Sequence, residues 1–343
     1  MAVWSQAGHS VAKAVLVDTE ILLPNLLILF VSIIIMGKVS DFAIDNTVKI
    51  SEISGLGKTT VGFVLLGFST SLPELSVSVI AALIDEVGVP VGNALGSNIV
   101  DVSLIMGLPV LLVALKKPEV NMTVNMLKEE FSSLYFGLFI ASLIPLSLMY
   151  LAHASRIVGL ILLIIFLIYT YRLSKREILT EGAEERVRGE AKKLDRYVLL
   201  TSAGVIGVIA VSYFVVYSAS NIAEIIGVPK ILMGATIVAF GTSLPELTLN
   251  VKAIAKEQWA LAFGNIVGSC FINITLILGI PLIASPLNVN MKIFSDLIIF
   301  SLIDNLFLWY FLTSGRMGWK EGAILLFLYL LFLATTFGVI SKP

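Results

Sequence analysis

Acidic and hydroxyl-bearing side chains occur twice in this chain with the same spacing, each time inside an apolar segment. A Thr-Ser-Leu-Pro-Glu sequence ends at Glu74 and again at Glu246, 172 positions later. Because residues three and four apart share a helix face, the hydroxyls of each copy would lie beside its glutamate. Those hydroxyls belong to Thr70, Ser71, Thr242 and Ser243. A carboxylate is costly in a bilayer, so two retained copies indicate a use for it.

A second duplicated motif, Gly-Asn-x-x-Gly-Ser, begins at Gly92 and again at Gly264. In each copy three polar residues recur every four positions, which gives a polar stripe on one helix face. The six residues are Asn93, Ser97 and Asp101 in the first copy and Asn265, Ser269 and Asn273 in the second. The glycines would let neighbouring helices approach closely. The duplication suggests that both motifs meet between two halves of the protein.

The atoms that these motifs gather are oxygens of carboxyl, hydroxyl and amide groups. Such ligands suit Na⁺, Ca²⁺ and Mg²⁺, and they suit zinc or copper poorly. The two histidines, His9 and His153, lie outside the motifs, and the single cysteine, Cys270, excludes an internal disulfide. The sequence therefore predicts a site for cations and no cofactor.

A proline in each Thr-Ser-Leu-Pro-Glu motif predicts a bent helix. Pro73 and Pro245 cannot donate a backbone hydrogen bond, and each ring clashes with the carbonyl four residues back. The carbonyls near Ser69 and Gly241 would then be freed. In a membrane, a bound cation is one partner that such carbonyls can take.

The composition indicates a membrane protein. Hydrophobic residues form 57% of the chain and charged residues 14%, and the mean hydropathy is +0.98. A soluble protein of this size would need far more polar surface. The formal net charge is −1, so the charge gives no reason to expect a nucleic-acid partner. The lipid bilayer is the expected environment, and nothing in the sequence indicates an obligatory protein partner.

Apolar runs of about 20 residues predict ten transmembrane helices. Those of the first half are 21–40, 58–84, 90–115, 130–151 and 155–173. Those of the second half are 196–219, 230–255, 258–284, 293–313 and 319–340. The predicted organisation is an N-terminal extension at 1–20, interfacial or disordered, a five-helix repeat at 21–173, a cytoplasmic linker at 174–195 and a second five-helix repeat at 196–343.

Five spans in each half is an odd number, so equivalent residues would cross the membrane in opposite directions. The predicted fold class is therefore an all-α polytopic membrane protein built from two inverted five-helix repeats. Basic residues favour a topology with both termini outside and the linker in the cytoplasm. In that topology 18 of the 23 Lys and Arg residues face the inside.

Structural interpretations compete with the functional one. The first motif could be only a helix kink and the second only a packing face. Glu74, Asp101 and Glu246 could be protonated carboxyls with structural hydrogen bonds, but acids retained in both copies favour a function. Asp304, in the ninth predicted span, has no acidic counterpart at Ser132. A structural hydrogen bond or a misplaced helix boundary explains it as well as a function does.

The paired motifs resemble the two alpha repeats of the sodium/calcium exchanger family, of the prokaryotic type, within the calcium/cation antiporter superfamily. The likeness covers essentially the whole chain, and it implies a ten-helix inverted-repeat fold with four cation sites arranged as a diamond. It also implies that Glu74 and Glu246 are the central ligands, flanked by Asp101 and Asn273. The surrounding oxygens would come from Thr70, Ser71, Ser97, Thr242, Ser243 and Ser269.

This chain departs from the family pattern at two places. Ser69 replaces the glycine that usually precedes Thr-Ser. Prokaryotic relatives often carry the aspartate in the second repeat and an asparagine in the first, whereas here Asp101 is in the first and Asn273 in the second. The neighbouring pair of equivalent positions also differs, with Asn98 in the first repeat and Cys270 in the second. The third negative charge has therefore moved across the pseudo-two-fold axis.

The predicted function is secondary active exchange of Na⁺ for Ca²⁺ across a prokaryotic cell membrane by alternating access. One alternative is Ca²⁺/H⁺ exchange, because a protonatable carboxylate could couple protons. Another is a cation channel, which would pass current at rates far above those of an exchanger. A hydrolase is disfavoured because no Gly-x-Ser-x-Gly or His-Glu-x-x-His pattern occurs.

Overall fold

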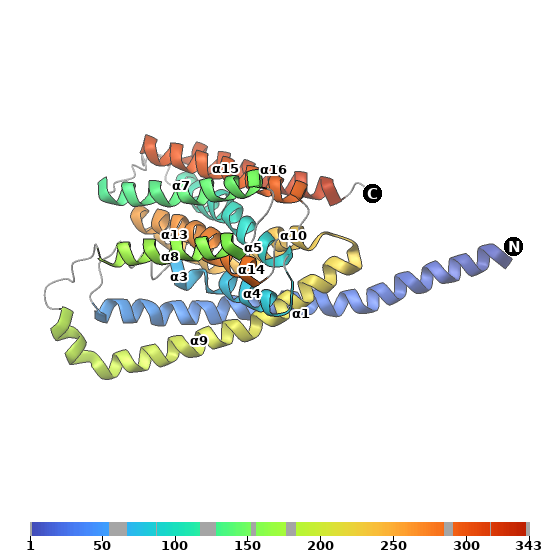
Figure 1. Ribbon diagram of the computed structural model, residues 1–343, viewed down its shortest axis with the longest axis horizontal. Coiled ribbons are helices and arrows are strands. Elements are labelled where there is room, and N and C mark those ends of the chain that lie inside the picture. Colours follow the sequence, from blue (N-terminus) through green and yellow to red (C-terminus); the bar gives the residue numbers. More distant parts are fainter. Residues whose placement is uncertain are drawn as a thin grey trace.

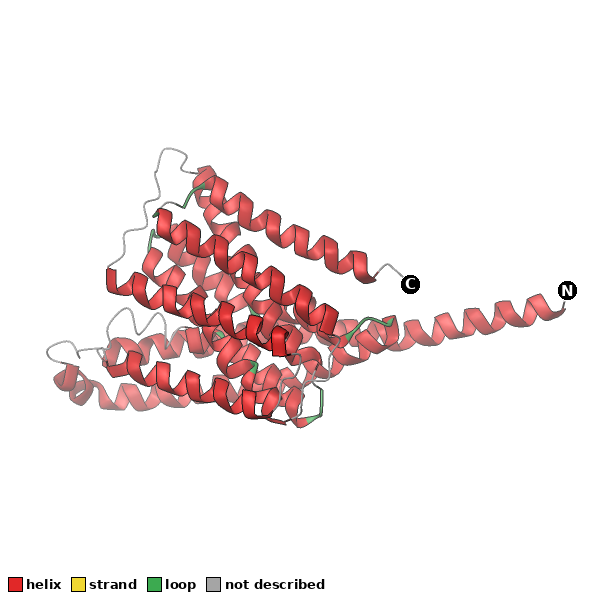
Figure 2. Cartoon of the chain, turned by 45° about the horizontal axis from the view of Figure 1, so that its top comes forward, coloured by secondary structure: helices red, strands yellow, loops and turns green. Residues whose placement is uncertain are grey.

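The described part of the protein is a bundle of helices. The computed structural model describes residues 2–54, 67–86, 88–116, 128–151, 156–175, 183–284, 291–315 and 317–340. Within these ranges the chain is helical apart from short turns and contains no strand (Figure 2). An all-α fold agrees with the apolar runs in the sequence, because a helix satisfies its own backbone hydrogen bonds in lipid.

The elements of the first half are α1 (Ala2–Ser54), α3 (Gly67–Thr70), α4 (Leu72–Leu83), α5 (Gly88–Ile99), the π-helical segment η2 (Val100–Met106), α6 (Gly107–Lys116), α7 (Lys128–Leu151) and α8 (Arg156–Lys175). Those of the second half are α9 (Ala183–Ile226), α10 (Lys230–Met233), η3 (Gly234–Val238), α11 (Ala239–Thr242), α12 (Leu244–Ala255), α13 (Trp259–Ile272), η4 (Asn273–Ile277), α14 (Gly279–Ala284), α15 (Met291–Ser314) and α16 (Trp319–Ile340).

Six helices in the described residues are long and apolar enough to cross a membrane, and a seventh span results if the bent segment from α10 to α12 counts as one. The six are Ile21–Asn46, Gly88–Lys116, Lys193–Ile226, Leu261–Ala284, Met291–Ser314 and Trp319–Thr336. Each of the ten predicted spans overlaps a helix, but the count of ten remains a prediction. These apolar helices fit an integral membrane protein.

Two helices extend beyond the predicted span boundaries. Helix α1 begins at Ala2, so it includes residues 2–20 of the predicted extension. The apolar span Ile21–Asn46 within α1 overlaps the predicted span 21–40. Helix α9 begins at Ala183 and includes the second part of the predicted linker, while residues 176–182 lie outside the described ranges.

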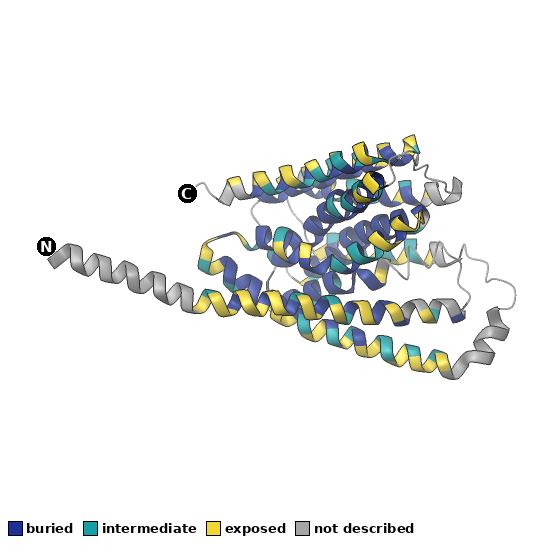
Figure 3. Cartoon of the chain, turned by 180° about the vertical axis from the view of Figure 1, so that it is seen from behind, coloured by how far each residue is buried: buried dark blue, intermediate teal, exposed yellow. Residues whose placement is uncertain are grey.

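Helices α1 and α9 form a peripheral pair that runs side by side in opposite directions (Figure 1). Only 22% of the apolar window of each is buried, against 67% for Gly88–Lys116 and 83% for Leu261–Ala284. Their exposed residues include Phe30, Leu199 and Ile206. Exposed apolar side chains on a spanning helix face lipid rather than water. The segments that carry the polar motifs therefore lie in the centre of the bundle, as Figure 3 shows.

Glycines set the closest helix contact in this centre. Helix α5 packs against α10 and η3 with almost no space between the two backbones. A Cβ atom added at Gly96 would lie 2.4 Å from both the Cα atom and the carbonyl oxygen of Ala235, and one added at Gly92 would lie 2.0 Å from the carbonyl oxygen of Ile231. The Gly-x-x-x-Gly spacing of the second motif is thus used for packing as well as for presenting polar groups.

We predict that Gly96→Ala destabilises the protein, because the obstructing atoms are backbone and cannot rotate away. Overpacking of this kind costs about 1–3 kcal/mol. The measurement is the thermal unfolding temperature of purified protein in detergent. Gly338→Ala is the matched control, because Gly338 is an exposed helical glycine whose added Cβ would meet no atom within 4 Å. Equal unfolding temperatures for the two variants would contradict the packing argument.

Candidate cation-binding site

Both Thr-Ser-Leu-Pro-Glu motifs lie at a break between two helices. Helix α3 ends at Thr70 and α4 begins at Leu72, while α11 ends at Thr242 and α12 begins at Leu244. In the second half the two segments are bent by 48°. Each proline is the second residue of the new helix, where its missing N–H costs no intrahelical bond. The predicted kink inside one helix is therefore the start of a second helix instead.

This break places the two glutamates favourably for negative charge. Glu74 lies in the first turn of α4 and Glu246 in the first turn of α12. The first turn of a helix carries unpaired N–H groups and the positive end of the helix dipole. Backbone geometry thus supplies part of the compensation that each buried carboxylate needs.

Asp101 and Asn273 lie at π-helical segments that the sequence did not predict. Asp101 is the second residue of η2, and Asn273 is the first residue of η4. A π-helical turn widens the helix locally and leaves some carbonyls without their usual partner, and such turns are frequent at functional sites. The two segments occur at equivalent places of the duplicated sequence, although the side chains differ.

Two hydrogen bonds cross between the halves at equivalent positions. The Thr70 hydroxyl donates to Oδ1 of Asn265 over 3.2 Å, and the Thr242 hydroxyl donates to Oδ1 of Asn93 over 3.1 Å. In each bond, the glutamate motif of one half contacts the asparagine motif of the other half. The pairing explains why both asparagines recur with the same spacing.

Other contacts join the halves without an equivalent partner. The Ser243 hydroxyl donates to Oε1 of Glu74 over 2.9 Å, and the hydroxyls of Ser71 and Ser269 lie 3.0 Å apart. The Asn273 amide donates to Oδ2 of Asp101 over 3.4 Å. A second bond from this amide reaches Oδ1 of Asn98 over 3.1 Å. The substitution of aspartate by asparagine in the second copy thus provides a donor for the aspartate of the first.

All ten predicted site residues are buried, and each is at most 1% exposed. Several of their oxygens have no hydrogen-bond partner among the residues that the structure describes. These are Oε2 of Glu74, Oγ of Ser97, Oδ1 of Asp101, both carboxyl oxygens of Glu246 and Oδ1 of Asn273. Buried acceptors without donors are costly, and a cation is the partner that satisfies several of them at once.

The three carboxyls lie within electrostatic reach of one another. Like charges at short range in an apolar environment repel strongly, so the group would be stabilised by cations or protons. In the described part of the chain, however, no three Asp, Glu, His or Cys side chains converge on one point as a ready metal site. A bound cation would therefore take carboxylate oxygens together with hydroxyl, amide or carbonyl oxygens.

Two further polar positions belong to this region: sequence reasoning missed Asn250, and it noted Asn98 only as a departure from the family pattern. Asn250 accepts a hydrogen bond from the Asn265 amide over 3.2 Å, and Asn98 accepts one from Asn273. Asn250 and its equivalent Ser78 are buried, and each lies four residues after a motif glutamate. A polar residue one turn beyond the glutamate in both copies was the signal that could have found them.

Asp304 is a further buried carboxyl outside the duplicated motifs. Asp304 lies in the middle of α15, so a misplaced boundary of the predicted ninth span does not explain it. Neither of its oxygens has a hydrogen-bond partner among the described residues, which argues against a structural hydrogen bond. The neighbouring Asn305 donates to the Ser142 hydroxyl over 3.1 Å. No contact in the described part of the chain gives Asp304 a role.

One family of known proteins matches most of this chain. The family described as "Sodium/calcium exchanger protein" matches residues 24–175 and 196–338. These two matched segments correspond to the two halves, and the stretch between them falls within the polar linker. The match covers well over half of the chain.

Individual relatives cover nearly the full length. The chain is 30% identical to the sodium/calcium exchanger MaX1 of Methanosarcina acetivorans, over 91% of this chain and 98% of that protein. It is 29% identical to the uncharacterized membrane protein MJ0091 of Methanocaldococcus jannaschii, over 90% and 99%. A solved structure of the sodium-calcium exchanger NCX_Mj shares the fold, with a TM-score of 0.67, 24% identity and coverage of 91% of this chain and 99% of that one. The chain therefore belongs to the sodium/calcium exchanger protein family.

Proposed function

We propose that this protein is a secondary active antiporter that exchanges Na⁺ for Ca²⁺ across the membrane by alternating access. One observation carries the proposal. Three carboxyls lie buried where the two halves meet, with acceptor oxygens that have no partner among the described residues. A permanent structural site would pair such groups, whereas a transport site must leave them available to exchangeable ions.

The choice of ions follows from the ligand chemistry and from the family. The site offers only oxygen ligands, which suit Na⁺ and Ca²⁺. Family membership and the similarity to MaX1 support exchange of these two ions. In this assignment Glu74 and Glu246 bind Ca²⁺ directly, and Asp101 and Asn273 flank them. The six hydroxyl-bearing residues complete the coordination of the bound cations.

The proposed architecture has ten spans in two inverted repeats. The opposite directions of α1 and α9 support it, as do the two crossed hydrogen bonds at equivalent threonines. Both termini would be outside and the linker in the cytoplasm, because basic residues concentrate on the linker side. Alternating access would come from movement of the peripheral pair α1 and α9 against the central helices.

The first test separates the coupling ions. Purified protein in liposomes is given ⁴⁵Ca outside, with an outward gradient of Na⁺, K⁺ or H⁺ imposed one at a time. We expect only the Na⁺ gradient to drive Ca²⁺ accumulation. Uptake driven by the H⁺ gradient alone would replace the proposal with Ca²⁺/H⁺ exchange. Uptake that needs no gradient and is accompanied by large currents would indicate a channel.

A second prediction concerns the two glutamates. A dehydrated Ca²⁺ in an apolar interior needs opposing negative charge, so Glu74→Gln and Glu246→Gln should each reduce Ca²⁺ uptake to background. Each glutamine keeps the size of the side chain, and gel filtration checks that the variants remain folded. Asp296→Asn is the control, because Asp296 is an exposed acid on α15. Wild-type flux in both glutamine variants would refute their assignment as ligands.

A third prediction uses the aspartate and asparagine that contact each other across the halves. Asp101→Asn alone removes a charge and should impair exchange. Adding Asn273→Asp restores one carboxyl and one amide at the same contact, because the two side chains already lie 3.4 Å apart. We expect the double variant to recover flux to within about ten-fold of wild type, a difference of roughly 1.4 kcal/mol, with altered Na⁺ dependence. A double variant as inactive as Asp101→Asn would show that the charge is needed on one side only.

A further inference from the structure

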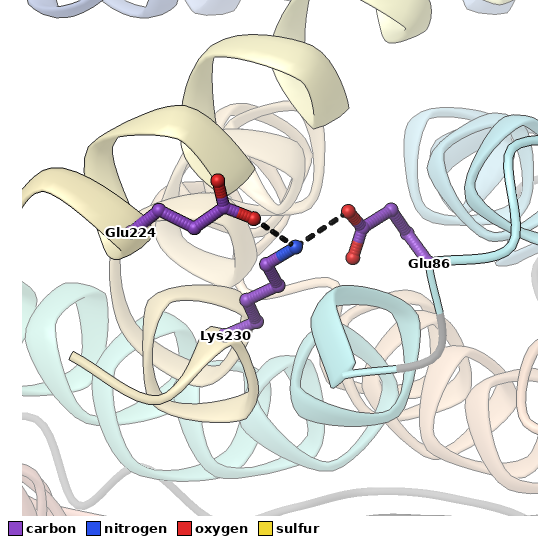
Figure 4. A network of polar contacts seen from close by, with 3 residues as sticks. All are labelled: Glu86, Glu224 and Lys230. Carbon is purple, nitrogen blue, oxygen red and sulfur yellow. Dashed lines mark hydrogen bonds and ion pairs between the residues drawn. The ribbon is translucent and has the colours of Figure 1, made fainter. Parts of the chain in front are cut away.

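A lysine outside the duplicated motifs binds two carboxylates, one from the end of a helix and one from a turn. Nζ of Lys230 lies 2.6 Å from Oε1 of Glu86 and 2.7 Å from Oε1 of Glu224 (Figure 4). Glu224 belongs to the last turn of α9, Lys230 is the first residue of α10, and Glu86 lies in the turn between α4 and α5. The network therefore joins the peripheral helix α9 to the central helices.

Two turns, each containing a residue with a positive φ, bring these three side chains together. Gly227 follows the last residue of α9 and has a φ of +70°, which lets the chain reverse. The N–H of Val228 bonds to the carbonyl of Ala223 over 2.9 Å. The turn after α4 uses Asp85 with a φ of +58°, and the N–H of Glu86 bonds to the carbonyl of Ala81 over 2.8 Å. Both turns thus have a fixed backbone geometry, which defines the positions from which the three side chains extend.

The two ion pairs differ in their surroundings. Lys230 and Glu86 have side chains 27% and 22% exposed, and both adjoin the tightly packed block of α5 and α10. A Cβ atom added at Gly88 would lie only 3.0 Å from the Cβ of Lys230. The Glu224 side chain is 64% exposed. An exposed ion pair is weak, so the bond from Lys230 to Glu224 is the one that can break.

We propose that Lys230, held in place by Glu86, is an ionic latch that holds the end of α9 against the central helices through Glu224. Opening this end of the transport path breaks the Lys230–Glu224 pair and leaves the Lys230–Glu86 pair intact. The inference rests on the proposed alternating-access function, because only a moving α9 needs a breakable contact here. Lys230, Glu86 and Glu224 are positioning residues, since their ion pairs join them to one another and not to the predicted ion ligands.

The sequence repeats this feature in the first half. The pattern Ile-x-Glu-Ile-x-Gly-x-x-Lys occurs at residues 50–58 and again at 222–230, 172 positions later. Glu52 and Lys58 are thus the equivalents of Glu224 and Lys230, although Lys58 lies outside the described residues. Because α1 and α9 run in opposite directions, the end of α1 lies at the other end of the bundle (Figure 1). A glutamate and a lysine with the same spacing therefore recur in the sequence near the end of each helix.

The third member differs between the two ends. The equivalent of Glu86 is Gln258, in a turn of the same geometry: Glu257 has a φ of +58°, and the N–H of Gln258 bonds to the carbonyl of Ala253 over 2.9 Å. A neutral amide cannot fix a lysine as a carboxylate does. Among the described residues, the Lys230 end thus offers a carboxylate at this turn position, whereas the equivalent turn offers an amide.

Distances between spin labels test the latch directly. Nitroxides at Leu83→Cys and Ile226→Cys, on exposed positions at the ends of α4 and α9, report the opening of this end. The native Cys270 is replaced by serine, and protein in lipid nanodiscs is measured in choline chloride. We expect Glu224→Gln to raise the ratio of long to short distances about two- to five-fold, the range expected for an exposed pair. Glu86→Gln should act in the same direction.

Control variants distinguish loss of the latch from a general disturbance of the bundle. Lys230→Arg keeps the charge and should retain the short distance, and Asp296→Asn should change nothing. Unchanged distances in both Glu224→Gln and Lys230→Met would overturn the latch. The readout requires no transport, so a wild type that failed to exchange Na⁺ for Ca²⁺ would refute the proposed function and leave the latch measurement valid.

Discussion

Burial of three carboxyls in an apolar bundle is the constraint to which the rest of the structure responds. An acidic side chain at the centre of a spanning helix costs about 2.5–3.5 kcal/mol, and Glu74, Asp101 and Glu246 are all fully buried. None of them has a Lys or Arg partner among the described residues. Helix breaks, helix N-termini, neighbouring hydroxyls and amides instead supply partial positive charge. This compensation is incomplete, which leaves the site receptive to cations.

Close packing holds the helices on one side of the site in a fixed position. The helices on the other side are free to move. Gly92 and Gly96 allow α5 to touch the backbone of α10 and η3, so the asparagine stripe is fixed relative to the second half. Helices α1 and α9 instead contact mainly each other, and much of their surface faces lipid. The alternating access proposed above would move this peripheral pair against the central helices.

Duplication followed by divergence explains the asymmetries. The crossed threonine–asparagine bonds are retained in both copies, since each supports the contact between halves. Asp101 and Asn273 have diverged into an acceptor and a donor that now bond to each other. Glu86 and Gln258 differ in charge within the same turn geometry, and Glu86 binds Lys230. The two halves are similar in backbone and different in charge, which suits a cycle whose two end states are unequal.

The sequence by itself determined the helical class, the two halves and the ten candidate residues that prove to be buried, because apolar runs and exact repeats of polar residues are local signals. It did not reveal the π-helical segments at Asp101 and Asn273 or the start of a new helix at each proline, since these depend on how neighbouring helices pack. Only the tertiary structure showed which asparagine each threonine bonds and that Lys230 reaches Glu86, 144 positions away. Pairings over such separations follow from the packing of whole helices, and no spacing within one segment encodes them.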